Sequence, residues 1–414
     1  MKIKLPEAAV TEGWFISGIE KFPSQRALLS LGLNSATRYY RELIVPGIGG
    51  VWFVRQLTWA VAGIELAGNS TYRPIKVANA IEALACKLQW EREQENYSGR
   101  GSRAFARDRE GVFWSFNNLS DQIYYVQVTY RQSAVRALSS LGLAYGTRFN
   151  SMQLSTIGHD LANAFFYQND GSSSKRSIYP ALNNWINDST RVIPKNTLQV
   201  ITRDDPTFAE KRIVMDLLLS ESVDNLSDVH RRPRLISAFG KNLERPPDIA
   251  TLKKRLNTKN KEQCDNIDTA IAFDKLLSAS QMVIHCASGL IESDPRITIS
   301  GISENDNLQI FLSNVRESAV IFDVTKGKKH PNVSEYVSEI IQECSSSMDL
   351  LIAIVKRDGN ILRYSNERII KGPLFGHHKD ISDADTGQQE QVGTEESSTE
   401  HKIKQLFSLW RDCQ

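Results

Sequence analysis

The amino-acid sequence predicts a mainly helical α+β protein with small β elements, built from several modules. Apolar residues recur at three- and four-residue spacing through the first hundred residues and again beyond residue 266, which is typical of amphipathic helices. The chain has 414 residues, of which 41% are hydrophobic and 24% charged, as in an ordinary globular protein. This composition excludes a mostly disordered chain, a fibrous repeat and a disulfide-dense scaffold.

The first hundred residues predict a series of helices joined by glycine-containing turns. Helices are expected over residues 34–43, 51–66 and 75–93, with Pro46 and Gly47 ending the first of them. The second helix is the most apolar long stretch of the chain, although Arg55, Gln56 and Glu65 interrupt it, and we expect Trp52 and Trp59 to lie in a core.

The middle of the chain, residues 130–166, predicts a helix, a short strand and a second helix. The first helix should stop at Gly142, which can adopt the left-handed conformation of a helix C-cap. Phe149, Met152 and Leu154 suit a short strand or wing, and Thr156 can begin the next helix. This order resembles a winged-helix module, in which a β-wing covers one end of the helical core.

A short internal repeat accompanies this module. Leu31-Gly32-Leu33 is repeated as Leu141-Gly142-Leu143, and Thr37-Arg38-Tyr39 falls in register with Thr147-Arg148-Phe149. Either a helix-turn module is duplicated, or two leucine-rich helix ends coincide.

The C-terminal third predicts a mixture of helices and strands. We expect a helix over 271–286, a strand over 319–324, and a helix that begins with the capping-box-like sequence Asn332-Val333-Ser334-Glu335. The turn residues 357–360 favour a hairpin between two strands, and the alternative is a helix that ends at Gly359. Residues 380–400 are acidic and of low complexity, which predicts disorder.

An amphipathic helix follows that segment, with its apolar side chains on one face: Ile403, Leu406, Phe407 and Trp410. This face either packs back onto the body of the protein or binds a partner protein. The predicted organisation is therefore a helical domain (1–98), a basic winged-helix-like segment (99–170), a helical and basic connection (171–265), a C-terminal α+β region (266–379), an acidic linker (380–400) and a terminal helix (401–414).

Local clusters of positive charge carry the strongest chemical signal. The chain holds 50 Lys and Arg against 48 Asp and Glu, a net charge of +2, so only local clusters can attract a polyanion. One cluster comprises Arg100, Arg103, Arg107 and Arg109, joined by Arg131, Arg136 and Arg148 of the winged-helix-like segment. A second, Lys253, Lys254 and Arg255, lies in a basic zone over residues 230–261.

Arginine and lysine bind phosphates, and the first cluster adjoins aromatic residues that can stack on bases. The clusters therefore predict contact with nucleic acid, and DNA is favoured over RNA. The alternative is an ordinary solvated or salt-bridged surface.

Sequence motifs for other chemistries are missing. The sequence contains no phosphate-binding loop, zinc-protease, nucleophile-elbow or kinase signature, and we expect neither a metal nor a cofactor. The five cysteines are scattered without a C-x-x-C pair, which suits a reducing cytoplasm. No apolar run is long enough for a membrane span. Asp323-Val324-Thr325-Lys326, with Asp294, partly resembles the carboxylates and nearby lysine of a nuclease site, although the spacing between acid and lysine differs.

Three segments resemble a poorly characterised group of bacterial proteins associated with anti-phage defence islands. They are Leu31-Gly32-Leu33 through the helix that ends near Ala62, the winged-helix-like residues 136–166, and the tail 402–412. The resemblance implies a cytoplasmic bacterial component that acts beside nucleases, helicases or modification enzymes. It brings no active site.

The sequence thus favours a non-enzymatic, nucleic-acid-associated component of a bacterial antiviral defence system that acts in a complex with effector proteins. One alternative is a nuclease or related enzyme with a site in the C-terminal region. Another is a protein-interaction scaffold without a nucleic-acid role.

Overall fold

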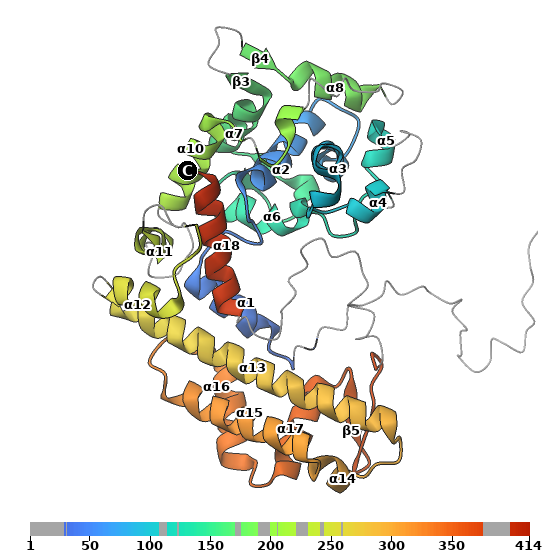
Figure 1. Cartoon of the computed structure of the whole chain (residues 1–414), viewed down its shortest axis with the longest axis vertical. Coiled ribbons are helices and arrows are strands. Elements are labelled where there is room, and N and C mark those ends of the chain that lie inside the picture. The colour runs from blue at the N-terminus through green and yellow to red at the C-terminus, as the bar shows by residue number, and fades with distance from the viewer. Residues whose placement is uncertain are drawn as a thin grey trace, which may run out of the picture.

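The chain is mainly helical, as the sequence predicts, with three small two-stranded antiparallel sheets among the described residues. The computed structural model describes residues 29, 31–106, 114–121, 124–169, 175–188, 199–204, 206–220, 231–240, 244–257, 260–375 and 398–414. Figure 1 shows two groups of helices, one above the other, with α1, α11, α12 and the last helix, α18, between them.

The upper group surrounds the apolar helix α2. Its elements are α2 (Val54–Ala67), α3 (Pro74–Glu93), η2 (Gln94–Asn96), α4 (Ser102–Ala106), α5 (Phe116–Leu119), α6 (Tyr130–Ser140), β1 (Ala144–Tyr145), η5 (Phe149–Ser151), β2 (Gln153–Leu154), α7 (Thr156–Phe166), β3 (Tyr167–Asn169), β4 (Lys175–Ser177), α8 (Tyr179–Asn187), η6 (Gln199–Ile201) and α10 (Phe208–Leu219).

The lower group is a bundle around one long helix, α13. It contains α13 (Lys261–Ser293), α14 (Ile299–Ser303), α15 (Asp306–Val324), α16 (Pro331–Ser338), the π-helical turn η7 (Glu339–Glu343), α17 (Ser347–Asp358) and the hairpin of β5 (Leu362–Ser365) and β6 (Arg368–Lys371). The junction is made by α1 (Asn34–Ile44), α11 (Arg231–Phe239), α12 (Ile249–Asn257) and α18 (Ser398–Asp412).

Helix α2 forms the centre of the upper group because it is apolar on nearly every side. All of its residues except Glu65 are buried. Gly63 permits the closest approach to α3, since a Cβ atom there would lie 2.4 Å from the Cβ atom of Ala78. The helices predicted over 34–43, 51–66 and 75–93 are confirmed as α1, α2 and α3.

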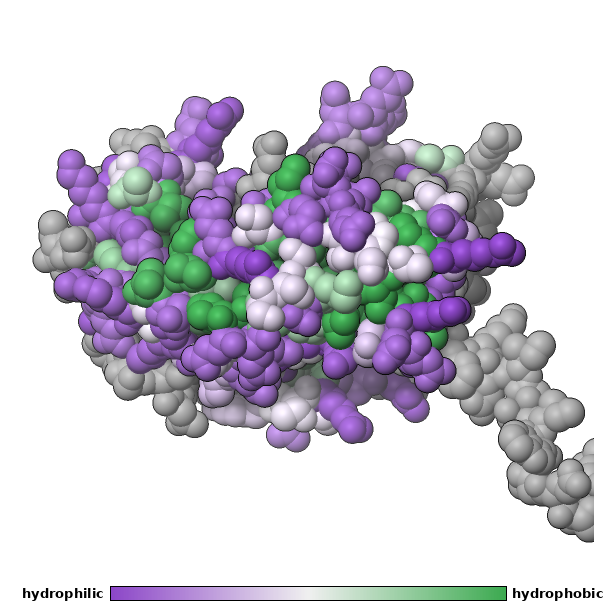
Figure 2. All heavy atoms as spheres, turned by 90° about the horizontal axis from the view of Figure 1, so that it is seen from below, coloured by the Kyte–Doolittle hydropathy of each residue, from purple (hydrophilic) through white to green (hydrophobic). Residues whose placement is uncertain are grey.

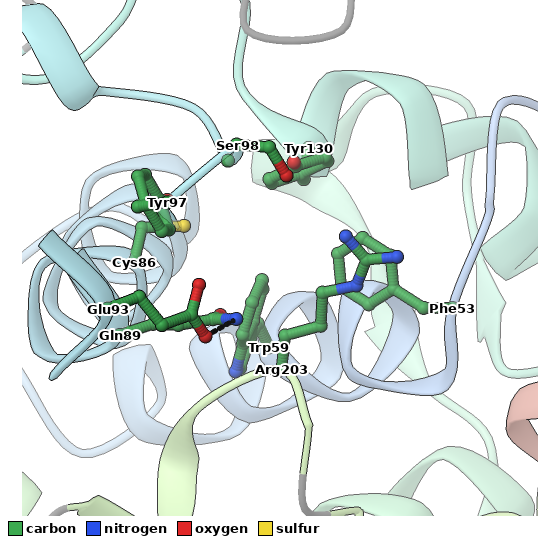
Figure 3. Close-up of a pocket in the computed structure, with 10 residues that line it drawn as sticks. Phe53, Trp59, Cys86, Gln89, Glu93, Tyr97, Ser98, Tyr130 and Arg203 are labelled. Atoms are coloured by element: carbon green, nitrogen blue, oxygen red, sulfur yellow. Dashed lines mark hydrogen bonds between the residues drawn. The ribbon is translucent and has the colours of Figure 1, made fainter. Parts of the chain in front are cut away.

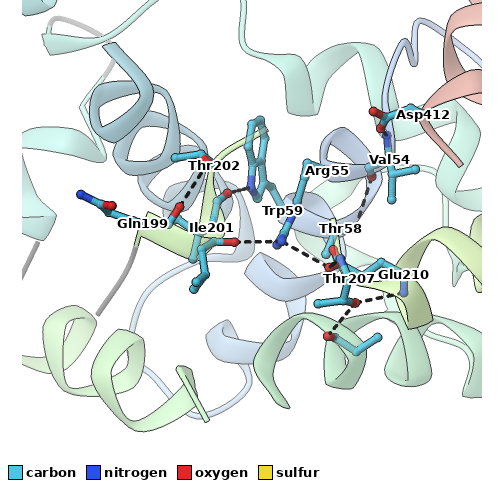
Figure 4. A network of polar contacts seen from close by, with 12 residues as sticks. Val54, Arg55, Thr58, Trp59, Gln199, Ile201, Thr202, Thr207, Glu210 and Asp412 are labelled. Carbon is cyan, nitrogen blue, oxygen red and sulfur yellow. Dashed lines mark hydrogen bonds and ion pairs between the residues drawn. The ribbon is translucent and has the colours of Figure 1, made fainter. Parts of the chain in front are cut away.

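A buried ion pair joins α2 to α10 (Figure 4). Arg55 and Glu210 are both fully buried, and Arg55 Nη2 lies 3.4 Å from Glu210 Oε2. The same Nη2 donates to the carbonyl oxygen of Val200 at 2.8 Å, and Trp59 Nε1 donates to that of Ile201 at 2.9 Å. Glu210 also receives the backbone N–H of Thr207, so one carboxylate closes the capping box of α10 and balances the buried arginine.

The winged-helix-like segment has the predicted order of helix, short strands and helix. α6 ends at a turn in which Gly142 has φ +73°, β1 and β2 pair antiparallel, and α7 follows. Ser155, rather than Thr156, is the N-cap of α7, and its hydroxyl accepts from Gly158. Of the internal repeat, the Leu-Gly-Leu turn is shared, since Gly32 has φ +71°. After it the helix α1 begins in the first copy, whereas the strand β1 begins at the corresponding position of the second.

The terminal helix α18 packs against the chain itself. It lies on α1, α10, α11 and α13. Ile403, Leu406 and Phe407 are buried, and Trp410 contacts Phe239 of α11 with ring centroids 5.7 Å apart. Of the two alternatives that the sequence left open for this face, the structure shows packing onto the body of the protein, with Trp410 half-buried. Contact of these four side chains with a partner protein stays a prediction.

Polar contacts fix both ends of α18. At its start, Arg41 Nε donates to Ser398 Oγ at 2.7 Å and the N–H of Thr399 donates to Asp274 Oδ2 at 2.7 Å. At its end, Asp412 Oδ2 accepts from the N–H of Val54 at 2.7 Å, at the start of α2. The predicted disorder of 380–400 lies mostly outside the described residues, although 398–400 already belong to the helix.

Two predictions in the C-terminal bundle are wrong. Residues 319–324 form the end of α15 and no strand. The favoured hairpin at 357–360 is instead the end of α17, where Gly359 at φ +60° is the left-handed C-cap, so the alternative is confirmed. The helix expected from the capping box at 332–335 begins at Pro331, and His330 is its N-cap.

The lower face of the C-terminal bundle carries apolar side chains in contact with solvent (Figure 2). The exposed large apolar residues of this bundle include four on α15, namely Ile310, Val320, Ile321 and Val324. Among the described residues, no helix is long and apolar enough to cross a bilayer. The domain boundaries stay a prediction.

Candidate nucleic-acid interface

The first predicted arginine cluster does not form one surface. Arg131 is buried, with Nε donating to Asn79 Oδ1 at 2.7 Å, and Arg100 donates to the carbonyl oxygen of Val128 at 2.8 Å with its guanidinium 4.1 Å from the Tyr130 ring. Arg131 therefore lies inside this structure and not on the surface where a phosphate contact was expected, whereas Arg100 is half-buried.

A buried carboxylate explains why these arginines turn inward. Glu82 of α3 accepts the backbone N–H groups of Tyr130 and Arg131 at 2.7 and 2.8 Å, at the positive end of the α6 dipole. Burial raises the pKa of Glu82, whereas Arg100 and those N–H groups act in the opposite direction. The Tyr125 hydroxyl donates to the same carboxylate at 2.9 Å. This polar cluster stabilises the junction of α3 and α6.

The remaining members of the first cluster are spread over the surface. Arg103 and Arg148 are exposed, and Arg136 is half exposed beside Glu42, with its Nε 3.5 Å from a carboxylate oxygen. Arg107 and Arg109 lie outside the described residues.

The start of the basic zone is also structural. Arg231 donates to the carbonyl oxygen of Leu43 at 2.7 Å, near the end of α1. Arg232 donates to Leu217 and Leu218 at 2.7 and 2.8 Å, where α10 ends. The last carbonyl groups of a helix lack partners within the helix and carry partial negative charge. These two buried arginines therefore cap neighbouring helices rather than contact solvent.

The other side of α11 faces α12 across a basic groove, which contains about 640 Å³ of space. The basic groove is lined by Arg234, Ser237, Ala238, Thr251, Lys254, Arg255 and Leu256. Among these described residues none carries a carboxylate, whereas three carry a positive charge and two a hydroxyl group. The volume lies in the range of small-ligand sites, and the chemistry suits a phosphate.

Contacts within and around α12 set which cations enter the groove. Lys253 turns toward α13, where Nζ donates to both carboxylate oxygens of Asp268 at 2.5 and 2.7 Å. Lys254 is exposed, and Arg255 Nη1 donates to the carbonyl oxygens of Ala238 and Phe239 at 2.9 and 2.6 Å. Of the three predicted cations, Lys254 and Arg255 are brought together and Lys253 is neutralised.

A carboxylate adjoins the groove at the start of α12. Asp248 accepts the backbone N–H and the hydroxyl of Thr251, both at 2.8 Å. These hydrogen bonds from Thr251 lower the pKa of Asp248. The carboxylate stays charged and fixes the first turn of the helix.

A second hollow lies between α2, α3 and the segment after η6 (Figure 3). Trp59, Phe53 and Arg203 lie on one side of it, and Tyr97 and Cys86 on the other. Water-sized molecules can place their centres in only about 20 Å³ of this space, which is room for roughly one water molecule. The hollow is thus too small for a nucleotide. Burial raises the pKa of the Cys86 thiol to about 12, so the thiol is protonated at neutral pH.

The residues of the faint nuclease motif lie far apart. Asp323 belongs to the end of α15, beside the start of α13, where the N–H of Lys328 donates to Asn266 Oδ1 at 2.8 Å. Asp294 follows the other end of α13. A helix rises 1.5 Å per residue, so the two carboxylates are separated by roughly 40 Å. They cannot bind one metal ion. Among the described residues, no group of three or more potential metal ligands is brought together.

Sequence reasoning missed Arg234, Ser237 and Thr251 as site residues. The run Lys253-Lys254-Arg255 marks one wall of the groove, but the opposite wall comes from another helix. The only signal for it is Arg234 in the basic zone, which is separated from the buried Arg231 and Arg232 by Pro233.

Comparisons with protein-family models, with curated proteins and with solved structures find no match to this chain.

Proposed function

We propose that this protein binds the phosphate backbone of nucleic acid through the basic groove between α11 and α12, without catalysing a reaction on it. One observation carries the proposal: Arg234, Lys254 and Arg255 line a solvent-open groove together with the hydroxyl-bearing Ser237 and Thr251. Guanidinium and ammonium groups bind phosphate oxygens, and a serine hydroxyl can add a hydrogen bond, whereas the Thr251 hydroxyl already donates to Asp248.

The lining also indicates which part of a nucleic acid the groove contacts. Backbone phosphates are the same at every base, and stacking on bases needs aromatic surfaces. The described lining residues include no aromatic side chain. Binding should therefore depend on charge and salt far more than on base sequence, and DNA remains the favoured nucleic acid.

We further propose that the protein acts within a bacterial anti-phage defence system, beside effector proteins and in the cytoplasm. This setting rests on the sequence resemblance of three short segments, and a winged-helix role for residues 130–166 belongs to the same proposal. Because α18 is covered by the body of the protein, an effector would have to bind elsewhere.

A protein-interaction scaffold is a second candidate, favoured by the exposed apolar residues of α15. Val320 and Ile321 are 52% and 40% exposed on adjacent positions of that helix. Replacing Ile321 by Glu should abolish complexes formed on co-expression with the products of neighbouring genes, and Glu317→Gln is the control. A complex that survives Ile321→Glu would remove this face from consideration.

The main proposal is tested by equilibrium binding of the full chain to duplex DNA, single-stranded DNA and RNA across a salt series. The logarithm of the affinity should fall linearly with the logarithm of the salt concentration, with a slope of about 0.9 per phosphate contact on duplex DNA. Charge reversal of Lys254 and Arg234 should weaken binding and flatten the slope. Lys253→Glu is the matched control, since Lys253 faces Asp268. Equal binding by the parent and the Lys254→Glu, Arg234→Glu variant would overturn the proposal.

A further inference from the structure

Gly240, which follows the last residue of α11, lies directly against Arg255 of the opposite wall of the groove. Its φ of +88° is in the left-handed region that favours glycine. A Cβ atom at this position would lie 2.8 Å from Arg255 Nη1, which is closer than a nonbonded contact allows. The missing side chain therefore leaves the space that the Arg255 guanidinium fills.

We infer that Gly240 is a positioning residue for the basic groove, acting through Arg255. The inference rests on the proposed function of the groove and deepens it. It concerns how α11 and α12 are held at a distance that allows side chains of both helices to contact one phosphate backbone.

The hydrogen bonds of Arg255 join those walls. Nη1 donates to the carbonyl oxygens of Ala238 and Phe239, the last two residues of α11. Arg234, Ser237 and Ala238, which line the groove, lie on the same helix within one turn of each other. Arg255 is therefore both a cation of the groove and the link that fixes α12 to the end of α11. A side chain at position 240 would require this guanidinium to shift from the place where it makes both contacts.

Another glycine of the chain separates this effect from simple helix capping. Gly359 follows the last residue of α17 as Gly240 follows α11, and its φ is +60°. A Cβ atom at Gly359 would have no neighbour nearer than the carbonyl oxygen of Lys356 at 4.0 Å. Alanine at either position requires a positive φ, which is less strained at +60° than at +88°, and of the two positions only 240 brings the Cβ atom against an arginine.

The test measures duplex DNA binding by full-length variants across a salt series. Gly240→Ala and Arg255→Ala should each reduce the slope by about 0.9, the loss of one phosphate contact. The double variant should show no further reduction, because both substitutions remove the same interaction. Gly359→Ala should keep the parental slope. A purely structural effect would lower the folded fraction and the apparent affinity but leave the slope unchanged.

Gly240→Asn provides a second variant in case alanine prevents folding. Asparagine adopts the left-handed conformation more readily than other residues but still places a Cβ atom against Arg255. A parental slope in both Gly240 variants, or a further loss in the double variant, would overturn the inference while Arg255→Ala still supports the groove. If Arg255→Ala and Lys254→Ala both keep the parental slope, the proposed function itself fails, and the inference fails with it.

Discussion

The two regions of the chain that are rich in basic residues, 100–148 and 231–255, place those residues differently. In the first, Arg100 and Arg131 turn toward the buried Glu82 and neighbouring carbonyl groups. In the second, Arg231 and Arg232 do the same, but one helical turn away Arg234 faces a groove with Lys254. Both regions divide their positive charge between interior and surface, but among the described residues it is in the second that surface cations from two helices line one groove.

The difference shows what decides the fate of a basic residue. Helix ends that meet inside the molecule leave carbonyl groups without partners, and a guanidinium with five donors can satisfy several of them. Arg232 does this for α10, and Arg255 does it for α11 from the rim of the groove. The density of positive charge in the sequence therefore overestimates the charge available to a ligand.

The largest effect should come from removing a buried arginine. Arg232→Ala should lower the free energy of unfolding by about 3 to 5 kcal/mol, because carbonyl groups at the end of α10 lose their donor in a buried site. Chemical denaturation measures the change. Arg234→Ala, two residues away, should cost less than about 1 kcal/mol but weaken DNA binding. Equal destabilisation by both substitutions would contradict the distinction between a buried, structural Arg232 and a groove-lining Arg234.

A smaller loss of stability is expected in the first region. Arg131→Ala removes the hydrogen bond to Asn79 and a cation within 5.0 Å of the Phe149 ring, and should cost about 2 to 3 kcal/mol. Thermal unfolding of this variant can be compared with that of Arg148→Ala, an exposed neighbour that should be nearly neutral. A neutral Arg131→Ala would mean that the arginine is not part of the core.

A pH series tests how dry the interior of the first region is. Burial raises the pKa of the Cys86 thiol from 9.0 to about 12, so the folded state holds the proton more tightly than the unfolded state. The stability from this group is therefore complete below pH 9 and is lost progressively as the pH rises toward 12. Melting temperatures should fall less steeply over this window in Cys86→Ala than in the parent. Parallel curves would show that Cys86 ionises normally in the folded protein.

The smallest change in stability, with the clearest functional contrast, is expected on α12. Lys253→Ala loses a partly exposed salt bridge and should cost at most about 1 kcal/mol, with DNA binding unchanged. Lys254→Ala should leave stability unchanged and reduce the salt slope of DNA binding by about 0.9. Measuring DNA binding and chemical denaturation on both variants checks the predicted change in stability and the predicted change in salt slope. The reverse pattern would place Lys253, and not Lys254, in the groove.

The spacing and length of apolar runs predicted the helices α1, α2 and α3. They failed at residues 319–324, because Val320, Ile321 and Val324 are apolar but exposed, so the run of β-branched residues suggested a strand where a helix continues. The turn sequence Arg-Asp-Gly-Asn suits both a hairpin and a helix C-cap, and only the packing of α17 distinguishes them.

The site was predictable only in part. A run of three cations marked α12, but helical geometry points Lys253 and Lys254 to different sides, and Asp268 is fifteen residues away in sequence from Lys253. The wall formed by Arg234 and Ser237 comes from a different helix. Which arginines enter the interior depends on where other helices end, and such information is nonlocal.

The packing of α18 against helices from earlier parts of the chain affects how the protein folds. Its contacts with the start of the protein, Ser398 with Arg41 and Asp412 with Val54, join residues 357 and 358 positions apart. Closing such loops delays folding, and contacts of this kind cannot form until synthesis has passed residue 412. The nascent chain must therefore carry uncovered those apolar surfaces of α1, α11 and α13 on which α18 packs, until α18 itself has been synthesised. Such surfaces are what chaperones bind, so we expect the folding yield to depend on chaperones.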